Sequence, residues 1–93
     1  MMGRVLLVDD DPAMVRDQVT HALGPHGVQI DVAHTAEEGL RQAAVQLPDV
    51  ILLDVNLPDL SGLEVYQRVR RIDGRVPVIF ITWARLPTPP SRR

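Results

Sequence analysis

The sequence predicts a three-layer α/β domain in which four parallel strands alternate with three helices. Short, largely apolar runs at residues 5–8, 50–53 and 76–82 are typical of strands buried on both faces. Between them lie segments whose apolar residues recur at helical spacing, bounded by capping or helix-breaking residues. Strands and helices that alternate through short loops favour a doubly wound parallel sheet with right-handed crossovers. The expected order is β-α-β-α-β-α-β.

Composition limits the classes of function. The chain has 93 residues, 45% of them hydrophobic and 24% charged, which is typical of one soluble globular domain. A net charge of -2 gives no reason to expect nucleic-acid binding. Cysteine is absent, which excludes disulfides and thiol chemistry. No apolar run is long enough to span a bilayer, and no signal-peptide pattern follows the N-terminus, so we expect a cytoplasmic protein.

The first half of the chain predicts two strands around a helix. The strand at residues 5–8 stops at three aspartates, of which Asp11 is expected to cap a helix with Pro12 in its first turn. That helix runs to the breaker pair at residues 24–25. Apolar and polar residues alternate over 28–32, which indicates a strand with one wetter face, near a sheet edge.

The second half begins with a capping box, in which Thr35 caps a helix and Glu38 reaches back. The strand at 50–53 follows and ends on Asp54. Ser61 is expected to cap a helix over 63–72, and a turn leads into the last apolar strand at 76–82.

Polar residues end three of the strands: Asp9 and Asp10 the first, Asp54 the third, and Thr82 the fourth. Ligands bind beyond the carboxyl ends of strands in such sheets. Clustered buried carboxylates repel each other unless a cation neutralises them, and the chain contains no lysine. Oxygen ligands with room for water suit Mg²⁺, which we expect as the cofactor.

Two sequence blocks and a strand carry a family resemblance. The blocks at residues 8–12 (VDDDP) and 48–64 (PDVILLDVNLPDLSGLE), with the strand VIFIT at 78–82, resemble bacterial response-regulator receiver domains, which are CheY-like and flavodoxin-like in fold. The resemblance covers residues 4–82 in order. It divides the chain into a partial receiver domain at 1–82 and an irregular tail rich in proline and arginine at 83–93.

The resemblance implies roles for five residues. Asp54 would accept a phosphoryl group from a phosphohistidine on a sensor histidine kinase or phosphotransfer protein. Asp10 and Asp54 would bind Mg²⁺ with the backbone carbonyl of Asn56, and Asp9 would hold a metal-bound water. Thr82 would donate its hydroxyl to the phosphoryl oxygens and report phosphorylation. The protein would then be a self-phosphorylating signalling module of a two-component system rather than a conventional enzyme.

The end of the sequence departs from the family. A receiver continues with a helix, a strand that carries a lysine and a switch aromatic, and a final helix, and none of these is recognisable here. Trp83 stands where the family has a small residue. We therefore expect an incomplete receiver whose last strand is an exposed sheet edge, with marginal stability and self-association through that edge.

Other interpretations stay open at this level. The chain would alternatively be a truncated, non-switching receiver fragment that only binds or oligomerises. A Mg²⁺-dependent phosphatase of the haloacid-dehalogenase type is disfavoured, because Asn56 stands where that family has a second aspartate. Several other residues are expected to be structural: Asp59 in a turn or cap, Tyr66 in the core, and the histidines His21, His26 and His34.

Overall fold

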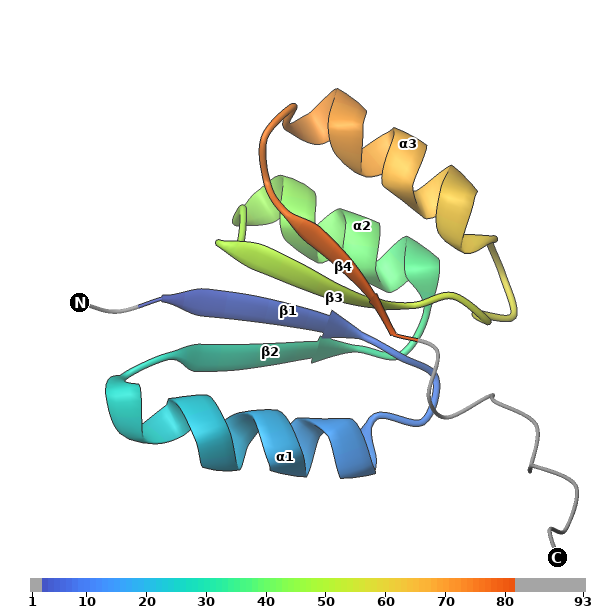
Figure 1. Ribbon diagram of the computed structural model, residues 1–93. Coiled ribbons are helices and arrows are strands. Elements are labelled where there is room, and N and C mark those ends of the chain that lie inside the picture. Colours follow the sequence, from blue (N-terminus) through green and yellow to red (C-terminus); the bar gives the residue numbers. More distant parts are fainter. Residues whose placement is uncertain (1–2, 82–93) are drawn as a thin grey trace, which may run out of the picture.

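The computed structural model describes residues 3–81 and has the predicted order of elements (Figure 1). The strands are β1 (Arg4–Val8), β2 (Gln29–Ala33), β3 (Val50–Asp54) and β4 (Val78–Ile81). The helices are α1 (Ala13–Leu23), α2 (Ala36–Val45) and α3 (Gly62–Ile72), with a short 3-10 turn at Gly24–His26. All strand pairs are parallel, in the order β2-β1-β3-β4. Helix α1 covers one face and α2 with α3 the other, which confirms the predicted fold class.

The main core lies between the sheet and the α2/α3 layer. Leu6 and Val8 of β1 and Ile51 and Leu53 of β3 point into it and are at most 2% exposed. Helix α2 approaches β1 closely at Gly39, where a Cβ atom would lie 2.7 Å from a methyl group of Val8. This close approach places the start of α2 beside the carboxyl end of β1.

The α1 side of the sheet is covered more thinly. Val15 is the buried residue of α1, whereas the neighbouring Met14 is 65% exposed. Helix α1 packs mainly against β2 on this side, and Val5 and Leu7 of β1, which are not part of the main core, are buried.

Strand β4 differs from the buried strand that its composition predicts. It begins at Val78 rather than Val76, because the first hydrogen bond with β3 is the one that the N–H of Ile51 donates to the carbonyl of Pro77. Ile79 and Phe80 are 54% and 44% exposed. Among the described residues, β4 pairs only with β3, so the expectation of an exposed sheet edge is confirmed for residues 78–81. Thr82 and the tail lie outside the described residues.

Two of the three predicted helix caps are confirmed. Thr35 and Ser61 accept hydrogen bonds from the backbone N–H of Glu38 and Glu64. The prediction for Asp11 is wrong. Pro12 occupies the cap position of α1 without a side-chain hydrogen bond, because Asp11 belongs to the preceding turn and donates its N–H to Asp9. Among the described helices, none is long and apolar enough to cross a membrane.

Candidate functional site

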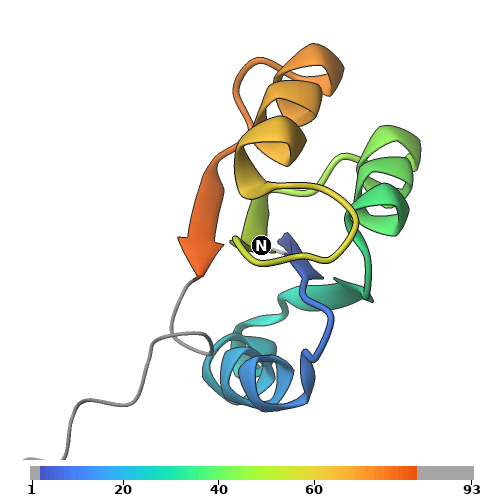
Figure 2. The same ribbon diagram turned by 90° about the vertical axis from the view of Figure 1, so that its right-hand side faces the viewer.

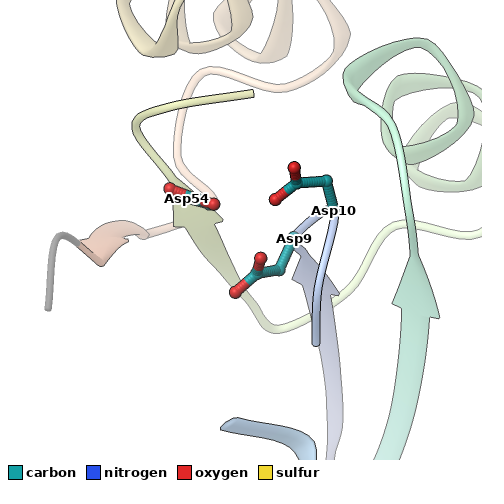
Figure 3. Close-up of side chains that lie close together, drawn as sticks. All are labelled: Asp9, Asp10 and Asp54. Carbon is teal, nitrogen blue, oxygen red and sulfur yellow. The ribbon is translucent and has the colours of Figure 1, made fainter. Parts of the chain in front are cut away.

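Three carboxylates meet beyond the carboxyl ends of the two central strands. Asp9 and Asp10 follow β1, and Asp54 is the last residue of the neighbouring strand β3. One oxygen of each carboxylate lies within 4.8 Å of the others, and Figure 3 shows the three side chains gathered beyond these strands. Asp9 and Asp54 are each only 2% exposed, while Asp10 is exposed. The structure thus brings together the three predicted metal-binding carboxylates.

Backbone hydrogen bonds fix two of these carboxylates. The N–H of Asp11 donates to Oδ1 of Asp9 at 3.0 Å, and the N–H of Asn56 donates to Oδ1 of Asp54 at 2.9 Å. The N–H of Asp9 itself donates to the carbonyl of Ala33 at the end of β2. The site is therefore held by the strands and by the first turn of each following loop.

The electrostatics of the cluster are unfavourable without a cation. Burial raises the pKa of Asp9 most, and the nearby carboxylates of Asp54 and Asp10 raise it further, although the N–H of Asp11 acts in the opposite direction. A buried carboxylate whose pKa is raised by like charges gains from a nearby positive charge. The three carboxylates present only oxygen donors, and Asp10 is open to solvent. This donor set fits a hard divalent ion such as Mg²⁺, which keeps several of its waters.

The two other predicted site residues are Asn56, which the structure describes, and Thr82, which it does not. Asn56 is exposed at the start of the β3–α3 loop, where its N–H contacts Asp54, and the metal-binding role of its carbonyl stays a prediction. Thr82 lies outside the described residues. The group of possible metal ligands found among residues 3–81 contains none of the three histidines, whose structural role stays a prediction.

A hollow of about 300 Å³ lies at the opposite end of the sheet, beside the amino end of β1. Its lining includes the Arg4–Asp31 ion pair, Val45 and Pro48. The three carboxylates do not line it, so it is separate from the acidic cluster.

The sequence does not reveal the contacts of Asp59. Both of its carboxylate oxygens accept backbone N–H groups from the first turn of α2, those of Ala36 and Glu37, each at 3.0 Å. Asp59 is thus a cap, as the sequence suggests, but of a helix that begins 23 residues earlier. The acidic residue in a turn is the only sequence signal, and it does not identify the partner.

Fold and site together define an open parallel α/β domain with an acidic pocket at the carboxyl edge of its central strands. The model of the response regulator receiver domain family matches residues 5–88. The chain therefore belongs to the response regulator receiver domain family. As a receiver domain of a two-component response regulator it is a phosphoacceptor module, and a non-switching fragment is not favoured.

Relatives and solved structures agree with this assignment. The chain is 44% identical over 79 residues to the transcriptional regulatory protein TrcR of Mycobacterium tuberculosis, covering 85% of this chain and 30% of that protein. It is 38% identical over 82 residues to the response regulator MprA of Mycobacterium ulcerans, covering 88% of this chain and 35% of that protein. The chain thus spans about a third of the length of these relatives.

The chemotaxis response regulator CheY4 of Vibrio cholerae superposes with a TM-score of 0.76 at 33% identity, over 86% of this chain and 68% of that chain. A CheY-like receiver domain protein from Methanospirillum hungatei superposes with a TM-score of 0.78 at 30% identity, over 88% of this chain and 65% of that chain.

Proposed function

We propose that Asp54 accepts a phosphoryl group from a phosphohistidine, in a Mg²⁺-dependent reaction supported by Asp9 and Asp10. The observation that carries the proposal is the convergence of the three carboxylates within 4.8 Å, with Asp54 at the end of a central strand. Asp9 and Asp54 are equally buried, but of the three carboxylates Asp54 is the one that belongs to a strand, as the last residue of β3.

The proposed transfer is a displacement at phosphorus. A carboxylate oxygen of Asp54 forms the new O–P bond while the P–N bond to the donor imidazole breaks. The electron pair of that bond stays on the imidazole nitrogen, which takes up a proton from solvent. The chain's own contribution is positioning, because the N–H of Asn56 holds Oδ1 of Asp54 and so fixes the orientation of the carboxyl group.

Asp10 and Asp54 would hold Mg²⁺ together with the carbonyl of Asn56, and Asp9 would hold a metal-bound water. When bound, the ion supplies positive charge that offsets the carboxylates and the phosphoryl oxygens. The raised pKa of Asp9 supports this assignment, since it reports a site that favours neutralisation of its charge. We include Thr82 as donor of a hydroxyl to the phosphoryl oxygens, on the basis of the family resemblance.

The proposed partner is a sensor histidine kinase or a phosphotransfer protein, and the proposed location is the cytoplasm. TrcR is a transcriptional regulatory protein, but for this segment, with its net charge of -2, we expect no direct contact with nucleic acid. We also infer self-association of this chain through the β4 edge, because the exposed Ile79 and Phe80 lie on a strand with one partner among the described residues.

The test uses the full chain with Mg²⁺ and acetyl phosphate as donor. We expect intact-protein mass spectrometry to show one base-labile phosphoryl adduct on the wild type and none on Asp54→Asn. The adduct should also disappear when Mg²⁺ is removed with EDTA.

Asp17→Asn is the matched control, because Asp17 is an exposed carboxylate on α1, outside the acidic cluster. This variant should form the adduct at the wild-type rate. An adduct that persists in Asp54→Asn would show that another residue is the acceptor.

A further inference from the structure

We propose that Asp59 is a positioning residue for the phosphoacceptor site, because it ties the loop that follows Asp54 to the start of helix α2. The inference rests on the proposed function, since the loop matters through its contact with Asp54. It assigns to Asp59 a role beyond that of an ordinary turn or helix cap.

The contact joins two segments that are distant in the sequence. The side chain of Asp59 leaves the β3–α3 loop and accepts from the N–H groups of Ala36 and Glu37, each at 3.0 Å. Figure 2 shows this loop swinging across the carboxyl edge of the sheet toward the start of α2. The two oxygens of the Asp59 carboxylate therefore bind the first turn of helix α2, which lies outside the loop.

These bonds complete the N-terminus of α2. The first N–H groups of a helix have no partner within the helix. Here Asp59 accepts the first two and Thr35 accepts the third, that of Glu38, at 3.1 Å. A carboxylate is favoured at this position by the helix dipole. Desolvation acts to raise the pKa of Asp59, yet the N–H groups of Ala36 and Glu37 lower it on balance, which agrees with this geometry.

The same loop is fixed at three other points. Its first turn is held by the bond from the N–H of Asn56 to Asp54, Leu57 is 8% exposed and packs in the core, and Ser61 caps α3. Asp59 is the point at which the loop is joined to α2. Leu60 packs against the core, while Asp59 supplies the side-chain hydrogen bonds from this part of the loop to α2 among the described residues.

A second link between the layers is weaker. Arg68 of α3 contacts Glu37 of α2 at 3.4 Å and Glu64 of its own helix at 2.8 Å. These side chains are 39–60% exposed, and exposed ion pairs of this kind contribute little. Arg68 therefore does not replace the paired hydrogen bonds of Asp59.

The experiment compares Asp59→Ala with Thr35→Ala in the full chain. Both variants remove caps from the same end of α2, but only Asp59 also holds the loop, so Thr35→Ala is the matched control. The readouts are the Mg²⁺ dissociation constant from calorimetry, the initial rate of phosphorylation by acetyl phosphate, and hydrogen exchange of the Asn56 amide by NMR. Urea unfolding of each variant gives the loss of stability against which these are compared.

We expect Asp59→Ala to bind Mg²⁺ about three- to tenfold more weakly, as for loss of one or two modest hydrogen bonds, and to exchange the Asn56 amide faster by a similar factor. Thr35→Ala should leave both values near those of the wild type. Asp59→Asn, which keeps one acceptor oxygen, should lie between wild type and Asp59→Ala.

Equal effects of Asp59→Ala and Thr35→Ala, in proportion to their losses of stability, would overturn the inference and leave Asp59 as a helix cap only. The two proposals fail in different ways. If the wild type forms no adduct, the proposed function fails, whereas amide exchange of Asn56 still decides whether Asp59 positions the loop.

Discussion

Replacing Asp9 by asparagine should stabilise the metal-free protein. The side chain of Asp9 is 2% exposed and its carboxylate lies within 4.8 Å of two others. Two unit charges at that distance repel by about 3 kcal/mol at an effective dielectric constant of about 20. Asparagine has nearly the same shape, keeps an oxygen for the N–H of Asp11, and presents a donor toward Asp54.

The net gain is smaller than the pairwise repulsion. The three consecutive aspartates also repel each other in the unfolded chain, so only part of the repulsion is lost on unfolding. We therefore expect Asp9→Asn to raise the free energy of unfolding by about 1–3 kcal/mol at neutral pH in EDTA. Mg²⁺ should reduce this difference, because a ligand at a hundredfold excess over its dissociation constant stabilises by about 2.7 kcal/mol and the variant binds it less well.

Urea unfolding followed by far-ultraviolet circular dichroism, with EDTA and then with saturating Mg²⁺, measures both effects. Asp17→Asn should change the free energy of unfolding by less than about 0.5 kcal/mol in either condition, as for exposed substitutions in general. A lower stability of Asp9→Asn than of the wild type in EDTA would refute the electrostatic reasoning. An equal increase in the free energy of unfolding on addition of Mg²⁺ for Asp9→Asn and the wild type would also refute it.

Three further outcomes are expected. Gly39→Ala should lower the free energy of unfolding, measured with urea, by about 1–3 kcal/mol, because the added Cβ would lie 2.7 Å from a methyl group of Val8 and overpack the core. Adding Val8→Ala to this variant should restore part of the lost stability. The N–H groups of Arg75 and then Val76 lower the pKa of Asp73 below its ordinary 3.8, so its contribution is present above that value and is lost as the pH falls through the lowered pKa. Asp73→Asn should therefore lose less stability than the wild type on acidification below 3.8, and parallel curves would contradict this. Ile79→Lys should weaken self-association in sedimentation velocity, because it places a charge on the exposed edge strand, whereas identical concentration-independent profiles would argue against association through β4.

Local chemistry made the strands and the acidic cluster predictable. The central strands of a parallel sheet are buried on both faces, so the apolar composition of β1 and β3 was sufficient to predict them as buried strands. Because the carboxyl ends of parallel strands lie at one edge, Asp9 and Asp54 could be placed together without knowledge of the side-chain geometry. The caps at Thr35 and Ser61 were predictable for a similar reason, since donor and acceptor are three residues apart.

Predictions failed where a distant or competing contact decides the outcome. Asp11 has the composition of a cap, but its N–H is used in the turn that closes on Asp9, and the helix begins one residue later. The apolar residues of β4 indicate a buried strand, although its neighbours leave Ile79 half exposed. Asp59 caps a helix whose first residue is 23 positions away, and a single sequence contains no signal for such a pairing.

The two sides of the acidic site therefore depend on different forces. Asp9 follows a strand whose four apolar residues are at most 4% exposed, so only a change in the core would move it. The β3–α3 loop is fixed instead by the hydrogen bond that the N–H of Asn56 donates to Asp54 and by those that Asp59 accepts from α2, for which water competes. Substitutions in the loop should consequently alter metal affinity and transfer rate at small cost in overall stability, whereas substitutions under β1 should alter stability first.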